Sequence, residues 1–264
     1  MDKIFKTILL DINDGVARLK LNRPEKHNAF NAEMIAELTA AFTLLDEQQS
    51  LRLVILSGNG PSFSAGADLN YMKKIAGFGY EENLLDAQKL AGLFKTVKNC
   101  KVPVMAIVHG AVFGGANGLS AACDIVLAHE ATIFAFSEVK LGITPATISP
   151  FVIARCGEAA ARELMLTGRK FTASEAYRFL LVNQVFQSQN QEELISTYIR
   201  QLLSSGPMAL KACKTLIQKV TEPHEEKTEI LNFTTKQIAE LRASEEGQEG
   251  LAAFFDKRKP NWIS

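Results

Sequence analysis

The chain has 264 residues, 47% of them hydrophobic, and its 29 basic and 29 acidic side chains give a formal net charge of zero. This length is enough for one large domain with a full core, and the neutral balance disfavours a nucleic-acid binder, which would carry a basic patch. No apolar run approaches the roughly 18 residues of a membrane span, so no membrane partner is expected.

The cellular compartment is predicted from the cysteines and the N-terminus. Four cysteines are scattered without the CxxC spacing of metal or redox sites, which favours buried thiols in a reducing cytosol. The first six residues, Met1 to Lys6, lack the apolar core of a signal peptide. We therefore expect a cytoplasmic protein. The histidines His109, His129 and His224 share no metal-ligand spacing, and no metal site is predicted.

The N-terminal elements carry clear local signals. Two apolar, alternating segments, residues 8–12 and 16–21, flank Asn13-Asp14-Gly15, which predicts a β-hairpin. Asn31 is a predicted N-cap for a helix that runs to about residue 48.

The rest of the chain divides into two patterns. Apolar strands are predicted at residues 53–56, 104–108 and 125–128, alternating with helical segments, which is typical of a covered α/β sheet. After about Asn190 only helices are predicted, at residues 194–204, 208–220, 228–241 and 245–255, with a polar break at residues 221–226. We expect an α/β core over residues 1–193 and a helical region over residues 194–264.

Two turns of small residues carry the strongest functional signal. The run from Gly114 to Gly118 follows the strand at 104–108 and precedes a helix, and Phe63 to Asp68 follows the strand at 53–56. Backbone N–H groups in such turns can stabilise a developing oxyanion, as acyl and enolate chemistry requires. A tight connection without function is the alternative for either turn alone. A nucleotide-binding loop is not supported, because neither GxGxxG nor GxxxxGK[ST] occurs.

Taken together, the motifs resemble the crotonase (enoyl-CoA hydratase/isomerase) superfamily over nearly the whole chain. The resemblance rests on the order of Leu21-Asn22-Arg23-Pro24, Ser64 to Asp68, His109-Gly110, Gly114-Gly115, Cys123-Asp124, Ser137 to Gly142, and Phe254 to Pro260. It implies a spiral of ββα repeats with C-terminal helices that pack in a homotrimer or a dimer of trimers. Residues 136–151 look most like bacterial methylglutaconyl-CoA hydratase-like enzymes of leucine degradation.

The resemblance also implies the catalytic residues. The N–H groups of Ala67 and Gly115 correspond to the oxyanion hole for a thioester carbonyl, and Glu138 corresponds to the general acid/base. The apolar residues 133–136 before Glu138 independently favour a desolvated carboxyl with a raised pKa.

The chain departs from the family pattern at two positions. Hydratases with two glutamates place the second carboxylate where this chain has Gly118, and Ala146 replaces a glycine whose N–H helps to hold water. This favours isomerase chemistry with a single base. It also predicts slow hydration of straight-chain substrates, which Gly118→Glu should raise if there is room for the side chain.

Substrate contacts are likewise carried over from the resemblance. Coenzyme A, as part of the substrate and not a separate cofactor, is expected to contact Lys26, His27, Ala65, Asp68, Leu69, Phe254 and Lys257. The basic run Lys257-Arg258-Lys259 suits its 3′-phosphate. Candidates to line the acyl pocket are Tyr71, Met72, Phe113, Phe134 and Phe136.

The favoured function is an enoyl-CoA hydratase for a branched, methylglutaconyl-CoA-like thioester. One alternative is an enoyl-CoA double-bond isomerase that works through Glu138 alone. The other, of a different class, is a crotonase-like protein that has lost catalysis and binds a partner.

Overall fold

The computed structural model describes residues 5–221 and 227–263, and residues 1–4, 222–226 and 264 lie outside this description. The chain divides into two compact units, of which the first contains residues 1–100 and 104–194 and the second contains residues 101–103 and 195–264. His224 and most of the predicted polar break fall outside the described residues.

The first unit is built on two sheets. A six-stranded sheet contains, in spatial order, β1 (Ile8–Asn13), β2 (Val16–Leu21), β3 (Leu53–Gly58), β4 (Val104–Val108), β6 (Ile125–His129) and β9 (Gln184–Phe186). A three-stranded sheet contains β5 (Ala111–Phe113), β7 (Ile133–Ala135) and β8 (Lys170–Thr172). From β2 to β9 the strands of the larger sheet pair in parallel. Parallel strands are covered on both faces, and the near-continuous apolar sequences of β3 and β4 meet that requirement.

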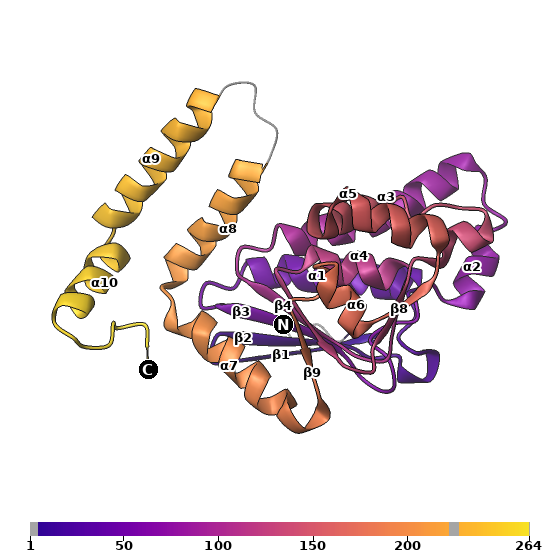
Figure 1. Cartoon of the computed structure of the whole chain (residues 1–264), viewed down its shortest axis with the longest axis horizontal. Helices are drawn as coiled ribbons and strands as arrows, with labels where there is room; N and C mark the ends of the chain where they lie inside the picture. Colours follow the sequence, from indigo (N-terminus) through magenta and orange to yellow (C-terminus); the bar gives the residue numbers. More distant parts are fainter. Residues whose placement is uncertain (1–4, 222–226, 264) are drawn as a thin grey trace. The chain divides into compact units, whose positions relative to one another are not determined.

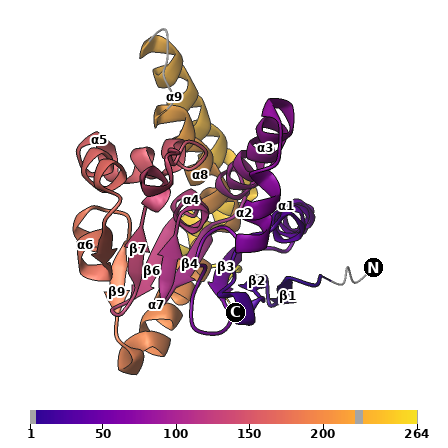
Figure 2. The ribbon, with the colours of Figure 1, turned by 90° about the vertical axis from the view of Figure 1, so that its right-hand side faces the viewer.

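The helices of the first unit connect these strands. They are α1 (Ala32–Asp46), α2 (Leu69–Ile75), α3 (Tyr80–Lys98), α4 (Gly115–Ala122), α5 (Ser149–Thr167) and α6 (Ala173–Arg178), with short 3₁₀ helices η1 (Pro24–Lys26), η2 (Ser137–Leu141) and η3 (Ser188–Asn190). Helices α1, α3 and α4 lie on one face of the larger sheet (Figures 1 and 2). The sheet therefore has a helical layer on the side where α4 begins.

The predicted N-terminal elements are confirmed. Strands β1 and β2 pair antiparallel, and Asp14 and Gly15 both have positive φ, as a tight hairpin turn requires. The side chain of Asn31 accepts a hydrogen bond from the N–H of Met34 at 2.9 Å and caps α1. Helix α1 ends at Asp46, slightly before the predicted residue 48.

The second unit is helical, as predicted. It contains most of α7 (Gln191–Ser204), then α8 (Pro207–Thr221), α9 (Lys227–Ala243) and α10 (Glu245–Phe255). The mixed α/β class with a helical C-terminal region is thereby confirmed. Among the helices that the structure describes, none combines the length and apolar character needed to cross a bilayer.

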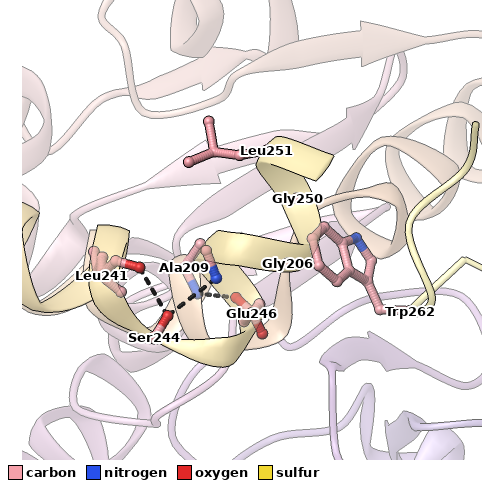
Figure 3. Close-up of a pocket in the computed structure, with 9 residues that line it drawn as sticks. Gly206, Ala209, Leu241, Ser244, Glu246, Gly250, Leu251 and Trp262 are labelled. Carbon is pink, nitrogen blue, oxygen red and sulfur yellow. Dashed lines mark hydrogen bonds between the residues drawn. The ribbon is translucent and has the colours of Figure 1, made fainter. Parts of the chain in front are cut away.

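A pocket of about 270 Å³ in the second unit lies between α8, α10 and the chain end (Figure 3). The carboxylate of Glu246 accepts hydrogen bonds from the N–H groups of Met208 and Ala209, both at 2.8 Å. The indole N–H of Trp262 donates to the carbonyl of Ser204 at 3.1 Å. Of the described residues that line this pocket, Glu246 alone carries a charge. Since that charge caps α8, the pocket is a structural feature of the helical unit.

Candidate active site

Backbone hydrogen bonds hold the two small-residue turns side by side. The N–H of Ser64 donates to the carbonyl of Ala111 at 3.1 Å, and the N–H of Phe113 donates to the carbonyl of Ser64 at 3.1 Å. Ser64 and Val112 thus form a parallel bridge that joins the segment after β3 to strand β5. The structure therefore brings together two turns that are distant in the sequence.

Phe30, from a third segment, contacts both turns. Its N–H donates to the carbonyl of Gly66 at 2.7 Å, and its carbonyl accepts from the N–H of Asp68 at 2.9 Å. A Cβ atom on Gly115 would lie only 3.3 Å from Cδ2 of the Phe30 ring. Phe30 is buried and so fixes the position of Ala67 relative to Gly115. Phe30 was not among the predicted site residues, although it lies directly before the predicted N-cap.

The two predicted donors have no protein partner in the described part of the chain. Neither the N–H of Ala67 nor that of Gly115 donates to an acceptor among the described residues. Ala67 is exposed and Gly115 is half-buried. Gly115 is also the first residue of α4, where N–H groups lack intrahelical acceptors and favour negative charge. Both groups are thus open to a ligand oxygen.

The Glu138 carboxyl lies beside this pair of turns. A Cβ atom on Gly114 would be 3.4 Å from Oε1 of Glu138. Gly114 has φ +51° and ψ −122°, a conformation that residues with side chains rarely adopt. The glycine therefore provides both the backbone turn and the space in which the carboxyl sits, next to the N–H of Gly115.

Burial raises the pKa of the Glu138 carboxyl, which is the direction predicted from the sequence. Desolvation raises the pKa of its carboxyl above the ordinary value, and a hydrogen bond from its own backbone N–H offsets only part of this effect. Its Oε2 atom is buried and has no hydrogen-bond partner among the described residues. A carboxyl of this kind holds a proton at higher pH than a surface glutamate does.

The position of the second family carboxylate is filled by hydrocarbon. A Cβ atom on Gly118 would lie 2.4 Å from Cγ2 of Ile148 and 2.8 Å from Cε2 of Phe94. Both neighbouring side chains are buried. The condition set for Gly118→Glu, room for the side chain, is therefore not met, because even the first carbon of a side chain overlaps its neighbours.

Ala146 does not offer a free donor in place of the family glycine. Its N–H donates to the carbonyl of Thr144 at 2.8 Å. Its carbonyl accepts from the hydroxyl of Ser149 at 2.8 Å, which fixes the turn before α5. The N–H that the resemblance relates to water binding is thus engaged in an intramolecular hydrogen bond.

Of the predicted coenzyme A contacts, Lys26, His27 and Ala65 lie together, and Leu69 is exposed nearby in the sequence. Lys26 and His27 are exposed at the end of η1, and the carbonyl of His27 accepts from the N–H of Ala65 at 2.9 Å. The ring Nδ1 of His27 is 3.0 Å from the hydroxyl oxygen of Ser62. Leu69, at the start of α2, is 75% exposed.

Asp68 has a structural role that the sequence did not predict. Its carboxylate pairs with the guanidinium of Arg23 at 2.9 Å and accepts from the N–H groups of Asn70 and Tyr71, which caps α2. Burial raises the pKa of Asp68, but the Arg23 hydrogen bond and the two N–H groups outweigh it, so the pKa lies below its ordinary value. Asp68 thereby fixes the segment that carries Ala67.

The C-terminal coenzyme A candidates lie in the second unit. Phe254, in α10, is 76% exposed, and Lys257 follows the helix with a positive φ. Arg258 forms a bidentate pair with Glu249 at 2.7 and 2.8 Å. Of the predicted basic run, Arg258 is therefore held by a carboxylate, and the contacts of Phe254 and Lys257 with substrate stay predictions.

The remaining candidates are mostly structural. Phe134 and Phe136 are buried and stack on Phe171, so they belong to the core and not to a pocket wall. His109 bonds the carbonyl of Gly60 at 2.8 Å, and His129 bonds the hydroxyl of Ser188 at 2.9 Å. Among the described residues, no group of three or more His, Cys, Asp and Glu side chains is arranged to hold a metal ion.

Comparison with known proteins shows the family of the chain. A family profile described as enoyl-CoA hydratase/isomerase matches residues 11–264. A crotonyl-CoA hydratase from Syntrophomonas wolfei is 29% identical over 262 residues, which cover 98% of this chain and 99% of that protein.

Solved structures are similar over almost the full length. An enoyl-CoA hydratase from Shewanella pealeana has a TM-score of 0.93 and 39% identity, covering 98% of this chain and 96% of that chain. Pseudomonas aeruginosa AtuE has a TM-score of 0.94 and 34% identity, covering 98% of this chain and 100% of that chain.

Proposed function

The chain belongs to the enoyl-CoA hydratase/isomerase family and has the crotonase fold, and from this premise we propose that it hydrates a branched enoyl-CoA thioester. A methylglutaconyl-CoA-like acyl group is the favoured substrate, because residues 136–151 resemble the bacterial enzymes of that kind. The hydratase activity is supported by a relative named crotonyl-CoA hydratase.

The oxyanion hole consists of the N–H groups of Ala67 and Gly115. When the thioester reacts at C2 or C3, negative charge moves to its carbonyl oxygen, and two donors fixed in advance stabilise that charge. Loss of one such donor typically costs about 2.7–4 kcal/mol of transition-state stabilisation. The ring and backbone of Phe30 support this role by holding the two donors in place before substrate binds.

Glu138 exchanges the proton at C2. The observation that carries the proposal is its buried carboxyl, which lies beside Gly114 and therefore next to the N–H of Gly115. Protonated, Glu138 delivers a proton to the enolate carbon; ionised, it removes one. Burial raises its pKa, so the protonated form persists to higher pH than in a surface glutamate. No cofactor other than the coenzyme A of the substrate is needed.

A double-bond isomerase is the second candidate, and the hydrocarbon at Gly118 favours it. Isomerisation moves a proton between two carbons and needs only one carboxylate. Hydration also requires a base for water, which relatives with two glutamates supply from the position that Gly118 occupies here.

Assays with a panel of acyl-CoA thioesters distinguish a hydratase from an isomerase and from a protein that has lost catalysis. We expect hydration of 2-enoyl-CoA substrates, fastest with 3-methyl branched ones, and measure it by loss of enoyl absorbance and by product mass. Conversion of 3-enoyl to 2-enoyl thioesters without water addition would establish the isomerase instead. Binding without turnover, detected by thermal shift, would indicate a protein that has lost catalysis.

We also propose a homotrimer or a dimer of trimers formed through the C-terminal helices. Large apolar side chains on the second unit are exposed, among them Ile217, Leu231 and Phe255. Exposed apolar surface of this kind favours association with a partner. Light scattering at micromolar concentration tests the proposal, and a monomer would refute it.

A further inference from the structure

A tyrosine–aspartate pair joins α2 to α3. The hydroxyl of Tyr71 donates a short hydrogen bond to Oδ1 of Asp86. Both residues are half-buried. Desolvation and the Asp86 carboxylate raise the pKa of Tyr71 far above its ordinary value, so the phenol keeps its proton and remains the donor. No described residue forms a hydrogen bond to Oδ2 of Asp86, which leaves that oxygen as an acceptor.

The α3 side of this pair can be located relative to α4. Phe94, Leu90 and Asp86 are spaced by four residues and lie on one face of α3. Phe94 lies against Gly118, and Cδ2 of Leu90 would be 3.9 Å from a Cβ atom on Gly115. The helices α3 and α4 therefore run in the same direction where they pack, and their N-terminal ends lie on the same side. Asp86 lies one turn, about 6 Å, beyond Leu90, on the side toward which the first N–H groups of α4 point.

The α2 side of the pair is fixed to the other turn. The Asp68 carboxylate accepts from the N–H of Tyr71 at 3.3 Å and from the N–H of Asn70 at 2.8 Å. Ala67 immediately precedes that cap. The pair thus joins the helix cap beside Ala67 to the helix whose Leu90 side chain lies against Gly115.

We propose that Asp86 is the second acid/base of this enzyme, supplied from α3, and that Tyr71 positions it. This inference rests on the proposed hydratase function, for which Gly118 leaves one proton-transfer group missing. It assigns the missing group to a carboxylate from a different helix, at a location that the hydrocarbon around Gly118 does not block.

In the proposed hydration, each of the two carboxyls carries out one proton transfer. Oδ2 of Asp86 takes a proton from water while the water oxygen bonds to C3, and the C2=C3 electrons move to the thioester oxygen held by Ala67 and Gly115. The enolate then collapses and C2 takes a proton from the Glu138 carboxyl. Water has been added, Asp86 ends protonated and Glu138 ionised, and exchange with solvent restores both.

The experiment compares two reactions on the same preparation. Hydration of 3-methyl-branched and straight-chain 2-enoyl-CoA needs both carboxylates, whereas exchange of the C2 proton of a saturated acyl-CoA in D₂O needs only Glu138 and the donors. Asp86→Asn keeps an acceptor for Tyr71, so we expect hydration to fall by about 10²-fold or more while exchange stays within about twofold of wild type. Tyr71→Phe should lower hydration less than Asp86→Asn and leave exchange unchanged.

The matched controls are Glu81→Gln and Tyr80→Phe, exposed residues at the start of α3 that should change neither rate. Hydration that survives in Asp86→Asn would refute the assignment of Asp86 alone. Equal loss of hydration and exchange would also overturn it, because it would show a structural role. A wild-type enzyme that exchanges the C2 proton but hydrates no thioester would instead refute the proposed hydratase function.

Discussion

The two sides of the turn at Gly114 and Gly115 differ sharply. On one side, the carboxyl of Glu138 sits in the space left by Gly114, and its Oε2 atom is buried; we call this the Glu138 wall. On the other side, Phe94 and Ile148 pack against Gly118 and leave no volume; we call this the Gly118 wall. The comparison shows that two glycines of one segment serve different purposes: Gly114 leaves room for a polar side chain, whereas Gly118 is part of the core.

The largest effect is expected from placing a carboxylate in the Gly118 wall. Gly118→Glu should lower the free energy of unfolding by at least about 4 kcal/mol, because it combines overpacking with burial of an unpaired charge. Urea unfolding measures this. Gly92→Glu is the control, since a Cβ atom on Gly92 of α3 meets nothing within 4 Å. A stable Gly118→Glu protein with faster hydration would show that the wall can open.

A substitution of Glu138 should lower turnover without lowering the stability of the protein. Glu138→Gln keeps the shape of the side chain but cannot exchange a proton, so turnover should fall by about 10²–10⁴-fold. Binding of an acyl-CoA, followed by calorimetry, should barely change. Near wild-type turnover in this variant would remove Glu138 from the mechanism.

Ile148→Ala tests whether the Gly118 wall acts only through packing. Ile148 is 1% exposed, and truncating a buried isoleucine costs about 2–5 kcal/mol. We expect this loss of stability together with turnover within a few-fold of wild type at a temperature where the variant is folded. Ile153→Ala in α5, the helix that begins directly after Ile148, is the control, because Ile153 is 41% exposed. A large fall in turnover would mean that Ile148 contacts the substrate.

The smallest expected effect is a displaced pH profile. Ionised Glu138 is the base in C2-proton exchange, so the exchange rate should rise as pH increases through its pKa. Because burial raises that pKa above 4.5, the rise should come at higher pH than for a surface glutamate. The exchange rate is measured as deuterium incorporation into a saturated acyl-CoA from acidic to neutral pH. A rise centred at or below the ordinary value would contradict the role of burial.

Local signals made much of the fold predictable. The hairpin follows from Asn13-Asp14-Gly15 and the start of α1 from Asn31, because each depends on a few neighbouring residues. The contents of the Gly118 wall were not predictable, since Phe94 of α3 and Ile148, the residue before α5, are distant in the sequence and meet only after folding. For the same reason Phe30 could not be singled out from the sequence, and Tyr71 was predicted as a pocket residue without its partner Asp86.

Phe30 also determines when this enzyme can become active during folding. The residue joins the segment before α1 to the turn that carries Ala67 and to the first residue of α4, which are far apart along the chain. Contacts between distant segments form late, because closing long loops costs entropy before any contact compensates for it. Helices can form before the Phe30 ring packs in its native position. In a refolding chain, catalytic turnover should therefore return after the circular dichroism signal, and it provides a sensitive assay of complete folding.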